Sequence, residues 1–121
     1  MILVDTSVWV DHLRYGDQCL EQLLMLDQVS IHPLVIGELA CGNLQHREKL
    51  LRLWKQLPYA IEANHQEVMI LLEQYNLMGK GIGFINLHLL ATTYLTMITK
   101  LWTRDKRLHK ISPTLGVAYL E

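Results

Sequence analysis

The sequence predicts an α/β fold in which helices cover a central, mainly parallel sheet. Short apolar runs alternate along the chain with amphipathic helical patterns, so helical crossovers connect the expected strands. The first run, residues 2–4, is continuously apolar, as in a strand buried on both faces. The chain has 121 residues, half of them hydrophobic, which excludes intrinsic disorder and favours a single domain over 1–121.

The first half of the chain contains two expected strands and three expected helices. They are a strand at 2–4, a helix ending before residue 16, a helix at 18–27, a strand at 29–32 and a helix at 33–41. Thr6 and Ser7 offer N-cap chemistry for the first helix, and Gly16 ends it. Pro33 is suited to the first position of the third helix, which Gly42 stops.

The second half continues the alternation. It comprises a helix at 50–57, a strand or connector at 59–61, a helix at 68–78, a glycine-rich loop at 79–83, a helix from 86 to 95, a strand at 101–103, a short helix to 110 and a closing strand at 116–119. Asn86 is expected to open one helix and Asp105 to cap another.

Charge and cysteine content limit the functional classes. Eleven basic residues face twelve acidic ones, so no global positive field indicates nucleic acid. Residues 1–43 hold six acids and one base, whereas the remainder is basic, which is one signature of a partner surface. Two cysteines do not make a disulfide framework, and neither a signal peptide nor a membrane span is evident. We therefore expect a cytoplasmic protein without membrane contact.

Three carboxylates fall next to the expected strand ends, where parallel sheets bind ligands. Asp5 ends the first strand, Glu38 lies one to two turns into the helix after the second, and Asp105 follows a later strand. Carboxylates gathered without bases favour a hard cation, Mg²⁺ or Mn²⁺. The alternative is structural: Asp5 and Asp105 are good helix caps, and Glu38 suits a solvated helix face.

Four segments resemble the PIN domain, and more closely the VapC toxins of bacterial toxin–antitoxin pairs. They are residues 1–9 (MILVDTSVW), 37–39 (GEL), 81–91 (GIG leading into LHLLA) and 101–108 (LWTRDKRL). The resemblance implies an α/β/α sandwich and a divalent-metal-dependent endoribonuclease that hydrolyses RNA. It also implies a homodimer that is neutralised by a small VapB-like antitoxin.

The acidic quartet of that family falls on Asp5, Glu38, position 86 and Asp105. The family has Asp at position 86, where this chain has Asn86. The amide oxygen is a neutral ligand, so this form is expected to be weakened or inactive. Two interpretations stay open, a natural, weakened nuclease or a deliberate inactivating substitution, and the intact surrounding segment favours the second.

Neighbouring residues are expected to support this site. The resemblance assigns to Thr6, Ser7 and Thr103 hydroxyls that orient it, although helix capping and strand placement explain them equally well. Basic residues around Asp105 are candidate RNA phosphate contacts, with a solvated helix end as the alternative: Arg104, Lys106 and Arg107.

The expected function is therefore that of a toxin ribonuclease with Mg²⁺ or Mn²⁺ as cofactor, an antitoxin as partner and RNA as substrate. Two other classes remain: a non-catalytic RNA-binding or interaction module of PIN fold, and an RNA-processing nuclease that has no antitoxin.

Overall fold

A three-stranded, wholly parallel sheet forms the centre of the molecule. The computed structural model describes residues 1–121 and orders the strands β2-β1-β3, with β1 at Ile2–Val4, β2 at Val29–Ser30 and β3 at Lys100–Trp102. Leu3 pairs with Ser30 on one side and with Leu101 on the other. The first strand of the chain is thus the central strand, and the burial of Leu3 and Val4 agrees with the strand buried on both faces that the apolar run predicts.

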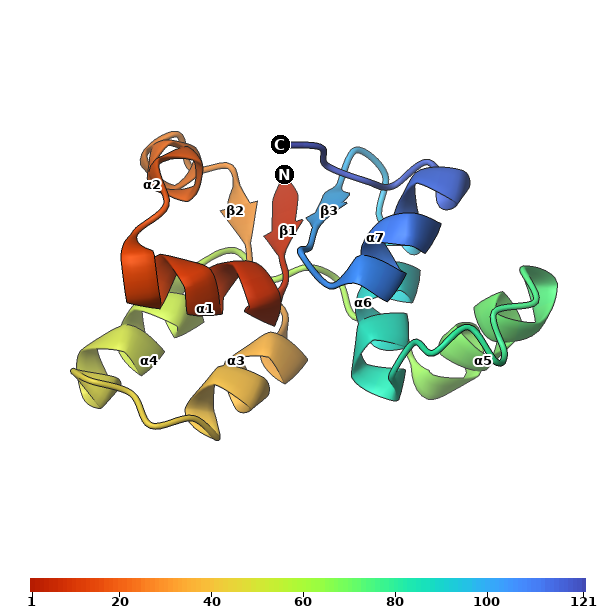
Figure 1. Ribbon diagram of the computed structural model, residues 1–121, viewed down its shortest axis with the longest axis horizontal. Helices are drawn as coiled ribbons and strands as arrows, with labels where there is room; N and C mark the ends of the chain where they lie inside the picture. The colour runs from red at the N-terminus through yellow and green to blue at the C-terminus, as the bar shows by residue number, and fades with distance from the viewer.

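Seven α-helices and one 3₁₀ helix surround the sheet. They are α1 (Thr6–Tyr15), α2 (Gln18–Met25), α3 (Pro33–Ala40), α4 (Arg47–Gln56), α5 (His65–Gln74), α6 (Phe84–Leu95), α7 (Lys106–Ile111) and η1 (Ser112–Leu115). Figure 1 shows α1–α4 gathered on the β2 side of the strands and α5–α7 on the β3 side. The predicted α/β/α arrangement is confirmed.

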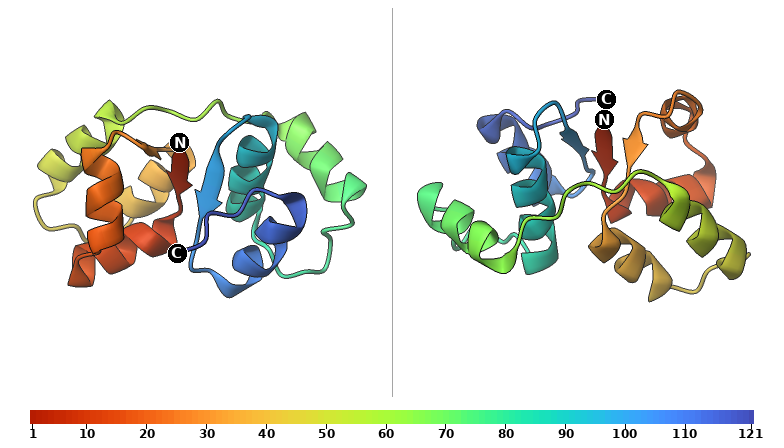
Figure 2. Two further views of the ribbon diagram at one scale, coloured as in Figure 1. Left: turned by 90° about the horizontal axis from the view of Figure 1, so that it is seen from above. Right: turned by 180° about the vertical axis from the view of Figure 1, so that it is seen from behind.

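One extended segment, residues 57–64, joins these two groups of helices by crossing the molecule (Figure 2). It is tied to the sheet because Tyr59 forms a single parallel bridge with Ile31. It is tied to α6 because the Ala63 N–H donates to the Thr92 hydroxyl at 3.0 Å. The segment expected as a strand or connector at 59–61 is therefore a connector with one bridge.

The core is continuous across both groups of helices. Leu3 and Val4 of β1 are fully buried, as are Leu89, Leu90 and Ala91 of α6, which packs against β3. All three tryptophans are buried, and Trp9 packs edge-on against Trp54 with ring centroids 5.9 Å apart. The tryptophans therefore serve packing and do not form a base-stacking surface.

Several expected boundaries are wrong. Helix α1 begins at Thr6 with Asp5 in the N-cap position, so Thr6 and Ser7 lie inside the helix. Helix α6 begins at Phe84 with Gly83 as N-cap, so Asn86 is its third residue and does not open it. The expected closing strand at 116–119 makes one bridge only, between Leu101 and Ala118. Capping residue types locate a helix start only to within one or two residues, and a single bridge is too little pairing to make a strand.

Helix lengths also bear on the membrane. None of the helices combines the length and apolar character that crossing a bilayer requires.

Candidate functional site

Asp5 is a buried carboxylate at the end of the central strand. It is 2 % exposed, occupies the N-cap position of α1 and makes no side-chain cap bond. Its Oδ2 instead accepts hydrogen bonds from Ser7 Oγ at 2.8 Å and from Thr103 Oγ1 at 2.7 Å. Asp5 therefore does not act as a helix cap, which was the structural alternative.

Glu38 is held by a hydroxyl from the same region. It is the sixth residue of α3, half-buried, and its Oε1 accepts a hydrogen bond from Thr6 Oγ1 at 2.7 Å. Because Thr6 directly follows Asp5, the first turn of α1 supplies hydroxyls to two carboxylates. Glu38 is thus not a freely solvated residue of an exposed helix face.

Asp105 acts as a helix cap, as the sequence predicts. Its Oδ1 accepts hydrogen bonds from the Arg107 and Leu108 amides at 3.1 and 3.0 Å. Its own amide donates to Thr103 Oγ1 at 3.1 Å, and the same hydroxyl donates to Asp5. The Thr103 hydroxyl thereby links the ends of β1 and β3.

Asn86 stands apart from this network. It is half-buried in the first turn of α6, and its side chain takes part in none of the hydrogen bonds of the structure. Nor do three acidic, histidine or cysteine side chains converge closely enough to hold a metal ion together. The structure brings α1, α3 and α7 together at one edge of the sheet (Figure 1), but the carboxylates of Asp5, Glu38 and Asp105 accept hydrogen bonds from different donors.

The chemistry of these groups nevertheless fits a hard divalent cation. Asp5, Glu38 and Asp105 form no ion pair, because every ion pair of the structure involves Arg104. Burying the Asp5 carboxylate without a counter-charge is costly, and two hydroxyl hydrogen bonds offset only part of that cost. Oxygen ligands of this kind are those that Mg²⁺ and Mn²⁺ prefer.

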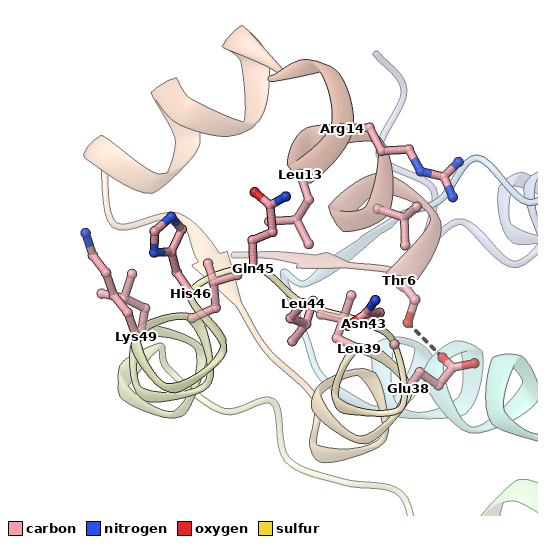
Figure 3. A pocket seen from close by; sticks show the side chains of 14 residues that line it. Thr6, Leu13, Arg14, Glu38, Leu39, Asn43, Leu44, Gln45, His46 and Lys49 are labelled. Carbon is pink, nitrogen blue, oxygen red and sulfur yellow. Dashed lines mark hydrogen bonds between the residues drawn. The ribbon is translucent and has the colours of Figure 1, made fainter.

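A groove of about 880 Å³ opens beside Glu38. Figure 3 shows the Thr6–Glu38 hydrogen bond at one end of the groove and the side chains of Arg14, His46 and Lys49 elsewhere on its wall. Its lining includes leucines from α1, α3 and α4 and the turn that joins the last two. Sequence reasoning missed this groove, since its walls come from segments that only tertiary packing brings together.

The three candidate phosphate contacts differ in their surroundings. Lys106 and Arg107 are exposed on α7, and one Arg107 nitrogen donates to the Gly81 carbonyl at 3.2 Å. Gly81 has a φ of +78°, and a Cβ there would lie 2.8 Å from the Arg107 side chain. The guanidinium of Arg104 is instead enclosed by three carboxylates, those of Asp11, Asp17 and Glu121.

His32 is a second buried polar group at the strand ends. It is fully buried, and its Nδ1 accepts a hydrogen bond from the Leu34 amide at 3.0 Å, so its imidazole caps α3. Burial lowers the pKa of His32 below its ordinary value, and the nearby His88 acts in the same direction against an opposing effect of Glu62. Histidine is an unusual capping residue, and the local sequence does not indicate this role.

Comparison with known proteins agrees with this architecture. The PIN domain family model matches residues 2–112. Two proteins named Ribonuclease VapC32, from Mycobacterium tuberculosis strains CDC 1551 / Oshkosh and ATCC 25618 / H37Rv, are each 44% identical over 121 residues. The match covers 100% of this chain and 98% of each relative.

Proposed function

The chain belongs to the PIN domain family, and from this we propose that it is a divalent-metal-dependent endoribonuclease, the toxin of a VapBC-type pair. The observation that carries the proposal is Asp5, a buried carboxylate that neither caps its helix nor meets a basic side chain. The name of the relatives supports RNA as the substrate. A cytoplasmic location and a single domain over residues 1–121 complete the proposal.

Four side chains are the proposed ligands of Mg²⁺ or Mn²⁺, and they would have to move closer together to hold the ion: Asp5, Glu38, Asn86 and Asp105. When bound, such an ion activates water and stabilises the charge that develops on the phosphoryl oxygens. Ser7 and Thr103 fix the orientation of the Asp5 carboxylate through its Oδ2.

The carboxylates of Glu38 and Asp105 are oriented by hydrogen bonds as well. Thr6 fixes Glu38, and the first turn of α7 fixes one oxygen of Asp105. This network of hydroxyls and amides limits how far each ligand moves.

Asn86 lowers the activity in this proposal. Its side chain is neutral, so the site carries one negative charge fewer than the four-carboxylate pattern of the family. The third position of α6 tolerates either residue, since an acidic side chain in the first turn also interacts favourably with the helix dipole. The same residue favours the second candidate function, a non-catalytic RNA-binding module.

RNA would approach over the first turn of α7. Lys106 and Arg107 are exposed there, next to the Asp105 cap, and supply phosphate contacts. Arg104 is left out of this surface, because its three guanidinium nitrogens already donate to carboxylates.

The antitoxin would lie in the groove beside Glu38. Its leucine-rich lining suits the apolar face of an amphipathic segment, and Glu38 at one end suits a basic side chain on that segment. We expect a tight complex that buries about 1,200–2,000 Å² or more, and a homodimer of the toxin. Leu53→Glu, at a half-exposed lining position, should abolish co-purification, whereas Met25→Glu, outside the groove, should not.

Cleavage of RNA with and without metal tests the nuclease proposal. Purified protein should cleave total RNA with Mg²⁺ or Mn²⁺, stop when EDTA is added, and lose cleavage in Asp5→Asn. RNA binding without cleavage in any metal, even in Asn86→Asp, would favour the non-catalytic module. If the protein cleaves RNA but no product of a neighbouring gene binds it, an RNA-processing nuclease would be favoured.

A further inference from the structure

Arg104 lies between Thr103 and Asp105, and its guanidinium is saturated by carboxylates. One terminal nitrogen donates to Asp11 at 3.0 Å, the other to Asp17 and Glu121 at 2.5 Å each, and Nε donates to Glu121 at 3.3 Å. Only 26% of the side chain is exposed. A planar guanidinium is suited to bridging several carboxylates at once, which a lysine cannot do.

The partners of Arg104 come from distant parts of the chain. Asp11 lies on α1, Asp17 is the N-cap of α2, and Glu121 is 17 residues beyond Arg104. The guanidinium also lies over the Trp102 ring, 5.4 Å from its centroid. The segment after β3 is therefore fixed against α1 and α2 by ion pairs, and the guanidinium also contacts the ring of the last β3 residue.

The backbone of Arg104 meets the candidate site directly. Its amide donates to Ser7 Oγ at 2.9 Å, and Ser7 Oγ in turn donates to Asp5 Oδ2 at 2.8 Å. The hydroxyl of Thr103, the residue before Arg104, donates to the same oxygen. A displacement of Arg104 would therefore reach both hydrogen bonds that orient Asp5.

We propose that Arg104 is a positioning residue of the nuclease: its three ion pairs hold residues 103–105 where Ser7 and Thr103 orient the Asp5 carboxylate. This inference rests on the proposed function only for its effect on cleavage. It replaces the phosphate-contact role expected from the sequence. Three carboxylates around one guanidinium leave a local excess of negative charge, which repels a phosphate instead of attracting it.

Amide hydrogen exchange tests the structural part of the proposal without any need for activity. In Arg104→Ala, the amides of residues 104 and 105 should exchange at least about tenfold faster, because the segment 103–105 is no longer held where these amides donate to Ser7 Oγ and Thr103 Oγ1. Asp17→Asn, which retains the α2 cap and removes one ion pair, should give a smaller effect in the same direction. Arg52→Ala, on the exposed face of α4, is the matched control.

Calorimetry with Mn²⁺ alone and cleavage kinetics test the functional part. Arg104→Ala should lose about tenfold or more in Mn²⁺ affinity and in kcat, with KM for RNA unchanged, as substitutions of groups that orient metal ligands do. The Mn²⁺ affinity and kcat of Arg104→Lys should lie between those of the unsubstituted protein and Arg104→Ala. If the alanine variant does not fold, the lysine variant provides the comparison.

Three results separate the alternatives. Unchanged exchange at residues 104 and 105 and unchanged Mn²⁺ affinity, with only a lower melting temperature, would reduce Arg104 to a stabilising residue and overturn the proposal. A raised KM with a flatter salt dependence and unchanged kcat would make it a phosphate contact. If the unsubstituted chain neither binds Mn²⁺ nor cleaves RNA, the nuclease proposal fails, while exchange still decides whether Arg104 positions Asp5.

Discussion

Replacing Asn86 by Asp is the sharpest test of the four-residue site. The two side chains have nearly equal volume, so packing changes little. Asn86 makes no side-chain hydrogen bond that the substitution would break, and its place in the first turn of α6 gives a new carboxylate about 0.3–1 kcal/mol from the helix dipole. The dominant change is therefore electrostatic.

Its magnitude follows from charge and distance. Two opposite unit charges about 4 Å apart near a protein surface attract each other by roughly 4 kcal/mol. A carboxylate and a dication at that distance attract each other by about twice as much. Desolvation of the carboxylate offsets much of this gain. A net gain of only about 1.4 kcal/mol still means a tenfold higher affinity, so we expect at least tenfold tighter Mn²⁺ binding and faster cleavage.

Without metal the two forms should differ little, because repulsion from Asp5 and Asp105 opposes the favourable helix dipole. The assay compares both forms by cleavage of total RNA with and without EDTA and by melting temperature against added Mn²⁺. Asn76→Asp, the same substitution at an exposed position beyond α5, is the control. Equal cleavage by all three proteins, with melting temperatures indifferent to metal, would remove position 86 from the site.

Two further predictions use charge and pH. The double substitution Lys106→Ala and Arg107→Ala should weaken RNA binding about equally for all sequences and flatten its salt dependence without lowering the melting temperature, and an unchanged salt slope would place the RNA surface elsewhere. Because burial lowers the pKa of His32 in the folded state, the unfolded chain binds a proton at this residue first, so stability is lost as the pH falls below 6.5. Urea unfolding at pH 7 and 5.5 should show this loss of unfolding free energy, by at most about 1.4 kcal/mol per pH unit. The loss should be smaller in His32→Asn, and an equal loss in both proteins would contradict the prediction.

Local sequence patterns were sufficient to predict the strands of the sheet and one helix cap. The apolar run at 2–4 predicts the buried strand β1, and Asp105 caps α7 as its position predicts. The role of Asp5 could not be decided from the local sequence, because an Asp before a helix has the pattern of a cap until the donors to its carboxylate are known. Its two hydroxyl partners include Thr103, 98 residues away.

Other features of the site depend on tertiary structure alone. Arg104 looks like a phosphate contact in a run of basic residues, but two of its carboxylate partners lie 93 and 87 residues earlier in the chain. Asn86 resembles a cap by residue type, yet Gly83 and Phe84 begin the helix sooner, which moves Asn86 into the first turn. Spacing along the chain carries no information on such contacts. The predicted helix start at Asn86 was therefore wrong, and the ion pairs of Arg104 could not be foreseen from the sequence.

Because β1 pairs with β3, the complete sheet cannot form until most of the chain has been synthesised. Strand β1 leaves the ribosome early, but its neighbour β3 and the Thr103 hydroxyl follow about 100 residues later. At a translation rate of roughly 5–20 residues per second, Thr103 is synthesised on the order of 5–20 s after Asp5. The helices α1–α4 and the groove beside Glu38 have all been translated by then. A nascent chain therefore contains every residue of the groove proposed for the antitoxin before it contains all the residues proposed for the metal site.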